Sequence, residues 1–271
     1  MSRIILVTGA SSGIGLAIAR FLSEKGETVL GTSRGANHGD KLEKFSLVQM
    51  DITKEDSVKS AVQFILQKHG RLDVVVNNAG TGFNGAVEDV TNDEVLSNFN
   101  LNVLGAWNVC RAVLPVMKKQ KSGYIINVSS VAGRTGLPFR SVYSSTKHAL
   151  EAMSESLSME VKRWGINVCI VEPSEFRTSI IENRGSASQV SNDYKHDFDR
   201  IVEQINRGVS DSPEPVAMGE CIYNIINNPK PKLRYVVANR TARLSILLKK
   251  ILPGRMYERL VMKHYGMKSQ K

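Results

Sequence analysis

The stretch R-I-I-L-V-T-G-A-S-S-G-I-G, residues 3–15, sets the fold of this chain, because it combines an apolar strand, a glycine turn and a helix start. Apolar residues continue at helical spacing from Leu16 to Leu22. Such a turn lets the pyrophosphate of a dinucleotide approach the backbone, and the positive end of the helix favours that anion. An ordinary glycine-rich loop is the alternative, which the flanking strand and helix disfavour. We expect cofactor contacts from Gly9, Ser11, Ser12, Gly13, Ile14 and Gly15.

The end of the second strand predicts which dinucleotide binds. Residues 28–32 form the strand, and Ser33 and Arg34 follow it. A carboxylate at this point normally holds the ribose of a cofactor that lacks the 2′-phosphate, whereas a hydroxyl and a guanidinium suit that phosphate. We therefore predict NADP(H) in preference to NAD(H). The alternative is that Arg34 is only a solvated surface residue.

Polar residues follow the next two strands at the same edge of the sheet. The third strand, residues 46–52, ends on Asp51 and Ile52, and Thr53 is the expected N-cap of the next helix. Asp51 can face a ligand there or serve only as a partner of the helix dipole. The fourth strand, residues 72–76, is nearly all apolar, as a strand covered on both faces should be. It leads to Asn77, Asn78, Ala79 and Gly80, which can hold backbone around an adenosine or simply form a turn.

A long helix and a fifth strand come next. Thr91 and Glu94 form a predicted capping box at the start of the helix, which continues through Asn102. Asn is unfavourable inside a helix, so Asn102 is either exposed or functional, and propensity alone favours exposure. The fifth strand, residues 124–128, leads to Ser130 at the ligand-binding edge.

Tyr143 and Lys147 stand four residues apart in a predicted helix, so both side chains lie on one face. A free tyrosine has a pKa of about 10, and a useful acid at neutral pH needs a pKa lower by about 3 units, or about 4 kcal/mol of charge stabilisation. A neighbouring ammonium supplies charge of the required sign. Taken alone, the pair is also common by chance on solvated helices.

In combination, T-G-A-S-S-G-I-G, N-N-A-G, the Asn102 helix, Ser130 and Y-S-S-T-K make the chain resemble the short-chain dehydrogenase/reductase family over residues 3–178. Ser130 precedes Tyr143 by thirteen residues, the separation usual in that family. The resemblance implies an α/β, Rossmann-like, doubly wound sheet with helices on both faces. The strand pattern predicts seven mainly parallel strands.

The resemblance also implies a catalytic tetrad of Asn102, Ser130, Tyr143 and Lys147. Tyr143 would exchange a proton with the substrate oxygen, which Ser130 would hydrogen-bond. Lys147 would depress the pKa of Tyr143 and bind the nicotinamide ribose, and Asn102 would orient a water that links Lys147 to solvent. These roles suit the chemistry, because hydride arriving at a carbonyl carbon builds negative charge on the oxygen.

The sixth strand, residues 167–171, leads to a second cofactor segment. Relatives usually have Pro-Gly where this chain has Pro173-Ser174, and serine restricts the backbone, which puts the loop path in doubt. The resemblance still places Pro173, Ser174 and Thr178 beside the nicotinamide end. The tract G-L-P-F at 136–139 looks most like the hydroxysteroid and retinol dehydrogenase branch. That likeness implies a hydrophobic, steroid-, retinoid- or lipid-like alcohol or ketone as substrate.

Length and charge predict one domain with an appendage. The chain has 271 residues, of which 42 % are hydrophobic, so we expect a catalytic domain at 1–239 and a basic helical extension at 240–271. The extension holds nine Lys or Arg and one acid, which accounts for most of the net charge of +10. It can rest on an anionic membrane, or, as the favoured alternative, pack over the pocket or a neighbouring subunit. No reader motif accompanies the charge, so nucleic acid is not an expected partner.

Residues 179–212 are polar and then amphipathic, and we expect a mobile substrate lid there; a surface excursion without a role is the alternative. The three cysteines lie far apart in apolar segments, which suits reduced thiols in the cytosol, and neither they nor the five histidines show metal-ligand spacing. A strand begins just after Arg3, which leaves no room for a signal peptide. We expect a cytoplasmic protein, with the extension as its one point of membrane contact.

The predicted function is an NADP(H)-dependent interconversion of a carbonyl and an alcohol. The rival is a non-catalytic protein of this fold that binds the cofactor to sense redox state or act as a scaffold, and the intact tetrad argues against it. The resemblance implies a homodimer or homotetramer, paired through the helices that carry Asn102 and Tyr143.

Overall fold

The computed structural model describes residues 2–267, and a sheet of eight strands forms its centre. Seven of these strands are parallel, which confirms the predicted doubly wound sheet. Their spatial order is β10 (Arg234–Val237), β8 (Ile166–Pro173), β7 (Gly123–Val128), β5 (Val74–Asn77), β1 (Ile4–Val7), β2 (Thr28–Ser33) and β4 (Phe45–Gln49). The eighth, β3 (Lys41–Leu42), pairs antiparallel with β4 at the edge and was not predicted.

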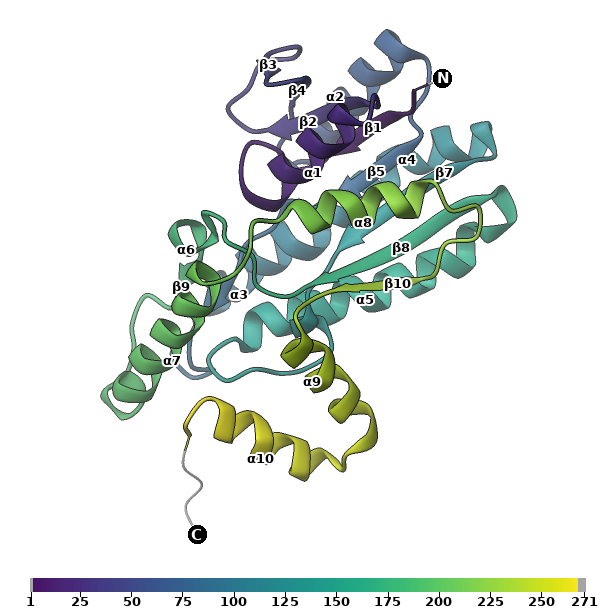
Figure 1. The fold of residues 1–271 in the computed structure, drawn as a ribbon. Helices are drawn as coiled ribbons and strands as arrows, with labels where there is room; N and C mark the ends of the chain where they lie inside the picture. The colour runs from purple at the N-terminus through teal and green to yellow at the C-terminus, as the bar shows by residue number, and fades with distance from the viewer. Residues whose placement is uncertain (1, 268–271) are drawn as a thin grey trace.

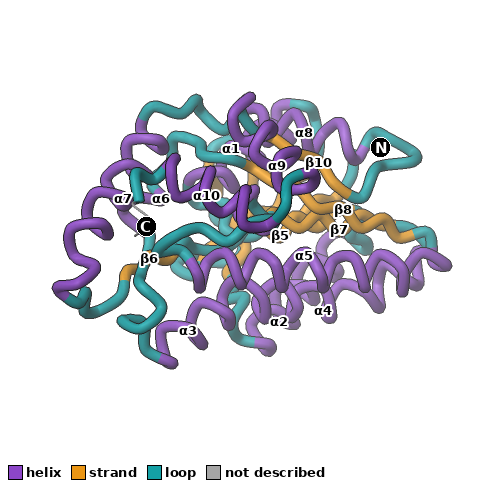
Figure 2. The backbone as a smooth tube through the Cα atoms, turned by 90° about the horizontal axis from the view of Figure 1, so that it is seen from below, coloured by secondary structure: helices purple, strands orange, loops and turns teal. Residues whose placement is uncertain are grey.

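Helices cover both faces of the sheet (Figures 1 and 2). On one face lie α1 (Gly13–Glu24) and α8 (Val216–Ile226), and on the other lie α2 (Glu55–His69), α4 (Gly105–Gln120) and α5 (Ser141–Val161). Side chains alternate along β1, so that Leu6 packs into the core beneath α2 and α4, while Ile5 and Val7 pack into the core beneath α1 and α8. Both faces are therefore buried, and ligands can reach the sheet only at its edges.

One helix start and one helix interior differ from the sequence expectations. Thr53 is not an N-cap: α2 begins at Glu55, and the Thr53 hydroxyl instead donates to Asp51 Oδ1 at 2.7 Å. The capping box of Thr91 is confirmed at α3 (Asn92–Phe99). The long helix that follows is interrupted by a π-helical turn, η1 (Asn100–Leu104), before α4.

The segment between β8 and α8 folds beside the carboxyl end of the sheet. It contains α6 (Ile180–Asn183), β9 (Gly185–Ser186) and α7 (Asn192–Ser210). Strand β9 pairs in parallel with β6 (Phe83–Asn84), which tethers the predicted lid to the loop after β5. Two short 3₁₀ segments, η2 (Val131–Gly133) and η3 (Lys162–Trp164), flank α5.

The C-terminal extension forms two helices, α9 (Arg240–Ile251) and α10 (Gly254–His264), drawn yellow in Figure 1. They project from the same end of the sheet as α7 (Figure 1). The last four residues of the predicted extension, 268–271, and Met1 lie outside the described residues. Within residues 2–267, no helix combines the length and apolar content that crossing a membrane requires.

Candidate active site

A cavity of about 1050 Å³ lies at the carboxyl end of the parallel strands. Its walls come from segments that are far apart in the chain: the glycine turn, the ends of β2, β4, β5, β7 and β8, the start of α5, and the inner sides of α9 and α10. The carboxyl end of such a sheet is where doubly wound proteins bind ligands. Of the predicted site residues, the cavity is lined by Gly9, Ser11, Ser12, Gly13, Ile14, Ser33, Arg34, Asp51, Ile52, Asn78, Ala79, Gly80, Ser130, Tyr143, Lys147, Pro173, Ser174 and Thr178.

The glycine turn is folded so tightly that side chains are excluded from it. Gly9 and Gly13 have φ of 64° and 56°, a region that favours glycine. A Cβ at Gly15 would lie 2.2 Å from the carbonyl oxygen of Gly9. Ser12 is the N-cap of α1, yet its side chain caps no amide. The N–H groups at the start of α1 therefore remain available to an anion such as a pyrophosphate.

Asn78 holds the turn in place. Its Nδ2 donates to the carbonyl oxygens of Thr8 and Gly9 at 3.0 and 3.3 Å, which ties the end of β5 to the end of β1. The amides of Asn78 and Ala79 both donate to the hydroxyl of Thr8. Asn78 thus shapes the cofactor cradle from within the protein, and Ala79 packs directly against Gly9.

The end of β2 offers charge of the sign that a phosphate needs. Arg34 is exposed at the cavity rim and, within residues 2–267, forms no ion pair. Asp51 is partly buried nearby, and it accepts hydrogen bonds from the amide and hydroxyl of Thr53 at 3.0 and 2.7 Å. Burial raises the pKa of the Asp51 carboxyl, but the Thr53 hydrogen bonds and neighbouring Lys54 and Arg34 bring it below its ordinary value. A hydroxyl and a free guanidinium at this point fit a 2′-phosphate.

Helix α5 brings Tyr143 and Lys147 together at the base of the cavity. Both are buried, at 8 % and 6 % exposure. The Lys147 ammonium donates to the carbonyl oxygen of Val128 at 2.9 Å and lies 5.9 Å from the centroid of the Tyr143 ring. Ser130 lies two residues after the end of β7, and its hydroxyl accepts a hydrogen bond from the amide of Ala132 at 3.1 Å. The same hydroxyl lowers the pKa of the Tyr143 phenol by hydrogen bonding.

These neighbours change the acidity of the phenol. Burial alone would raise the pKa of Tyr143, but the charges of Lys147 and Arg140 and the hydrogen bond from Ser130 outweigh it and lower that pKa. Burial lowers the pKa of Lys147 against the opposing attraction of Tyr143. The arrangement favours a phenol that can exchange a proton closer to neutral pH than free tyrosine does.

Asn102 is buried, at 2 % exposure, so the expectation of an exposed position is wrong. Its Oδ1 accepts from the amide of Thr81 at 2.9 Å, and its Nδ2 donates to the carbonyl oxygen of Thr81 and to the hydroxyl of Thr146. The π turn η1 presents this amide to the loop after β5. A Cβ at Gly80 would lie 2.9 Å from Asn102 Oδ1 and 3.7 Å from Lys147 Nζ. Asn102 and Lys147 therefore approach the same point of the loop.

The loop after β8 follows a path that serine accommodates. The amide of Ser174 donates to the carbonyl oxygen of Val237 at 3.0 Å, and Ser174 is not among the residues with positive φ. Thr178 lies against the glycine turn: a Cβ added at Gly13 would be 3.4 Å from the Cβ of Thr178. The two cofactor segments thus close on each other across the cavity.

Sequence reasoning missed two arginines of the cavity, and it did not identify which residues of the extension would line the wall. The arginines Arg140 and Arg184 lie beside Tyr143, and the position of Arg140, three residues ahead of Tyr143, was the available signal. The tail also contributes to the wall, through Leu244, Leu248, Tyr257, Leu260, Val261 and Tyr265. The extension therefore packs over the pocket, as the favoured alternative predicted.

Residues 2–267 contain no group of three or more His, Cys, Asp or Glu placed to hold a metal ion. The cysteines Cys110, Cys169 and Cys221 are free thiols, and burial raises their pKa values to about 12, 12 and 11.

Known proteins are similar to this chain in sequence and in fold. A family model described as short chain dehydrogenase matches residues 3–189. The chain is 38 % identical over 258 residues to the 3-ketodihydrosphingosine reductase of Bacteroides thetaiotaomicron, a match that covers 94 % of this chain and 95 % of that protein. A short-chain dehydrogenase from Streptomyces avermitilis matches with a TM-score of 0.82 at 32 % identity, covering 98 % of this chain and 97 % of that one. The structure of ElxO with NADP bound matches with a TM-score of 0.73 at 25 % identity, covering 88 % and 97 %.

With the glycine turn, the buried tyrosine–lysine pair and these relatives in agreement, the chain belongs to the short-chain dehydrogenase family, oxidoreductases that act on CH–OH and C=O groups.

Proposed function

We propose that the protein is an NADP(H)-dependent oxidoreductase that interconverts a carbonyl and an alcohol on a hydrophobic, lipid-like substrate. The observation that carries the proposal is the meeting of Tyr143, Lys147 and Ser130 in a cavity that is also lined by the glycine turn. An acid, a charge that acidifies it and a hydroxyl donor are what a carbonyl oxygen needs when it gains negative charge.

Each residue of the tetrad has its own task in this proposal. When bound, the cofactor supplies the hydride. Tyr143 donates a proton to the substrate oxygen during reduction and accepts it during oxidation. Ser130 donates a hydrogen bond to that oxygen, and Lys147 stabilises the phenolate. Asn102, through its hydrogen bonds to Thr81, holds the loop beside Lys147 and orients a water that carries protons to solvent.

The cofactor site follows the same logic. The pyrophosphate would rest on the start of α1 within the glycine turn, and Ser33 and Arg34 would hold the 2′-phosphate. Asp51, Ile52 and Ala79 would flank the adenosine, while Pro173, Ser174 and Thr178 would border the nicotinamide. The NADP in the structure of the relative ElxO supports this choice of cofactor.

A lipid-like substrate suits the outer half of the cavity. Its wall there is built largely from apolar side chains of α9 and α10, such as Leu244, Leu248 and Val261. A long hydrocarbon chain laid along these helices would leave its carbonyl near Tyr143. The name of the relative from Bacteroides thetaiotaomicron, a 3-ketodihydrosphingosine reductase, supports a long-chain ketone.

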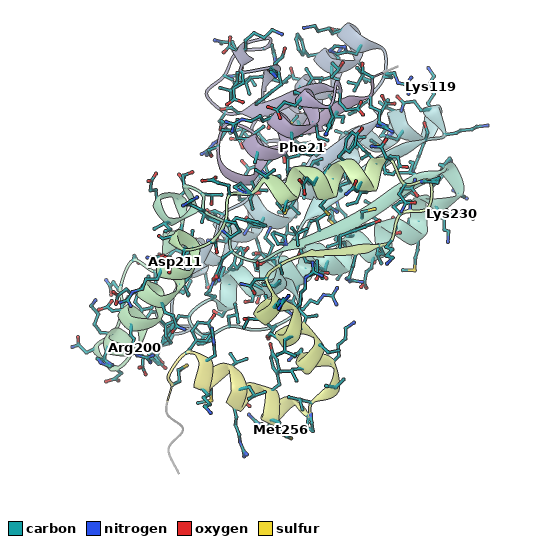
Figure 3. All side chains as sticks on the ribbon, in the orientation of Figure 1. Phe21, Lys119, Arg200, Asp211, Lys230 and Met256 are labelled. Atoms are coloured by element: carbon teal, nitrogen blue, oxygen red, sulfur yellow. The ribbon has the colours of Figure 1, made fainter. Side chains whose placement is uncertain are left out.

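The same helices are a candidate membrane contact. Leu247, Ile251 and Met256 are 53 %, 64 % and 51 % exposed and do not line the cavity. Met256 lies on the side of α10 that faces away from the sheet (Figure 3). The basic residues Lys250 and Arg255 adjoin Ile251 and Met256 in the sequence. We propose that residues 240–271 act as an extension of the catalytic domain 1–239 that rests on anionic lipid, from which the substrate enters the cavity.

Assembly through the long helices belongs to the same proposal. Leu104, Trp107 and Met159 are exposed hydrophobic residues on η1, α4 and α5, at 50 %, 47 % and 73 %. A homodimer or homotetramer that pairs these helices would cover the three residues. Each subunit would still bind a small-molecule substrate in its own cavity.

A panel of long-chain ketones tests the proposed function. We expect NADPH to be oxidised in the presence of at least one long-chain ketone, and NADH to support a much lower rate at equal concentration. Tight NADPH binding without turnover of any carbonyl compound would contradict the proposal.

A further inference from the structure

Two arginines reach the cavity beside Tyr143 without an acidic partner. Arg140 is 9 % exposed, and its Cζ lies 4.6 Å from the centroid of the Tyr143 ring. Its Nε is fully buried with no hydrogen-bond partner, and within residues 2–267 its guanidinium forms no ion pair. The positive charge of Arg140 therefore lies in a poorly solvated place, which is costly without a partner.

Arg184 stands in a similar environment. Its Nη1 donates to Asn206 Oδ1 at 2.9 Å, but its Nε is buried and lacks a partner. Burial, with added repulsion from Arg140, lowers the pKa of Arg184 to about 10. Two guanidinium groups that repel each other therefore share one wall of the cavity.

The short strand β6 fixes both arginines in position. Gly85, just after β6, donates its amide to the carbonyl oxygen of Phe139 at 2.8 Å and forms an isolated bridge with Arg140. On the other side, β9 pairs with β6 immediately after Arg184. One two-residue strand therefore anchors the backbone on which each guanidinium is carried.

Local packing adds to this anchoring. Phe139 has a φ of 55°, a left-handed conformation that is unfavourable for a bulky residue, and its ring packs edge-on against Tyr194 and Phe198 of α7. A Cβ added at Gly82 would lie 3.1 Å from Arg184 Nε, so the Arg184 side chain packs against the backbone of Gly82. A strained backbone of this kind persists only where the surrounding contacts fix the residue, and such residues are common at functional sites.

Other arginines at this end of the sheet are neutralised. Arg134 pairs with the fully buried Glu172 at 2.6 Å, and Arg234 pairs with Glu151 at 3.2 Å. Glu175 also lines the cavity and attracts Arg184, yet within residues 2–267 it makes no ion pair with Arg140 or Arg184. The reacting end of the cavity therefore carries more positive than negative charge, because Arg140, Arg184 and Lys147 face Glu175 there.

We propose that Arg140 and Arg184 bind an anionic group of the substrate, a carboxylate or a phosphate ester, a few bonds from the carbonyl that Tyr143 protonates. Paired guanidinium groups recognise both of these oxyanions through bidentate hydrogen bonds. The inference rests on the proposed function and narrows its substrate class to an amphiphile. The acidic group and the carbonyl lie at the base of the cavity, and the apolar chain lies along α9 and α10.

Matched substrates and variants test the inference. The substrates are a long-chain 4-oxo acid, its methyl ester, a 3-oxoalkyl phosphate and an amino ketone of equal chain length, each assayed with NADPH. The variants are Arg140→Gln and Arg184→Gln. The control is Arg177→Gln, since Arg177 is an exposed arginine that bonds Glu214 at 3.0 Å and does not line the cavity.

We expect the wild-type protein to favour one of the two anions over the ester and the amine by about tenfold or more in kcat/KM, and whichever anion wins identifies the group. Arg140→Gln and Arg184→Gln should each remove about tenfold of that preference, while the Kd for NADPH changes by about twofold or less. Both substitutions also remove a charge that lowers the pKa of Tyr143, which alters the rates with acid and ester alike, so the readout is the ratio of the two kcat/KM values within each protein. The control should retain the preference.

Several results would overturn the inference. Equal use of the acid, the phosphate and the ester by the wild-type protein would do so, as would an unchanged preference in both glutamine variants. A large rise in the Kd for NADPH would assign the arginines to the cofactor instead.

The proposed function fails in a different way, when no ketone at all is reduced. In that case, calorimetric binding of the 4-oxo acid, the 3-oxoalkyl phosphate and the methyl ester to the NADP⁺ complex still decides the inference, and equal affinity for all three would reject it.

Discussion

The Lys147 ammonium lies 5.9 Å from the centroid of the Tyr143 ring and is held there by the carbonyl oxygen of Val128, at 2.9 Å. Because α5 places the two residues one turn apart and β7 supplies the anchor, the charge cannot move away from the phenol. The lowered pKa of Tyr143 follows from this arrangement, in which positive neighbours overcome the effect of burial.

Removing that charge should shift the pH profile of the reaction. Alcohol oxidation needs the phenolate of Tyr143, so its kcat/KM rises as pH increases through the pKa of that residue. In Lys147→Met the pKa of Tyr143 should rise, moving the profile to higher pH and lowering the rate at neutral pH by about 10²-fold. Lys119→Met, at the distant end of α4 (Figure 3), is the control. An unshifted profile in Lys147→Met would contradict the assignment.

Replacing Arg34 with alanine should discriminate between the two cofactors. A charge-assisted hydrogen bond contributes about 1.5–3 kcal/mol, so Arg34→Ala should weaken NADPH binding by about 10- to 100-fold. NADH lacks the 2′-phosphate, and its Kd should stay within about twofold. Fluorescence titration of both cofactors measures this, and equal losses for the two would reject the role of Arg34.

A methyl group at Gly15 should open the glycine turn. In Gly15→Ala the new Cβ would meet the carbonyl oxygen of Gly9 at 2.2 Å, a backbone contact that only a shift of the turn can relieve. We expect a loss of about 1–3 kcal/mol in stability and weak cofactor binding, seen as a lower Tm that NADPH no longer raises. Gly136→Ala, where an added Cβ meets nothing within 4 Å, should behave as wild type. A normal NADPH response in Gly15→Ala would argue against the cradle.

Acidic substitutions on the apolar face of the extension should abolish contact with anionic lipid. Leu247→Asp combined with Ile251→Asp places acids on the exposed face of α9. We expect the wild-type protein, but not this variant, to float with vesicles that contain phosphatidylserine. Val87→Asp, at a residue that is 76 % exposed elsewhere, is the control. Equal flotation of wild type and variant would remove the membrane proposal.

The parallel sheet could be predicted because each strand is an apolar run that ends in a turn. Two-residue strands such as β3, β6 and β9 show no periodicity, and their pairing depends on segments brought together by the fold. The burial of Asn102 was hidden for the same reason, since its partners Thr81 and Thr146 are 21 and 44 residues away. Helix propensity describes only the local cost of that asparagine.

In the candidate site, too, residues close in the sequence could be predicted, whereas residues brought together by the fold could not. Tyr143 and Lys147 share one helix, so their spacing alone brought them together. Arg184 reaches Tyr143 only because β9 pairs with β6, a contact that spans about a hundred residues and leaves no local pattern. The same holds for the wall formed by α9 and α10, whose apolar residues predict a helix face but not the cavity it covers.

The central claim is that the phenol of Tyr143 transfers the proton, and Tyr143→Phe tests it most directly. The substitution removes one oxygen from a side chain that is 8 % exposed, so the fold and the Kd for NADPH should remain nearly unchanged. We predict that NADPH-dependent reduction of the best ketone substrate falls by at least about 10²-fold in kcat. A variant that binds NADPH normally and retains most of its kcat would contradict the account.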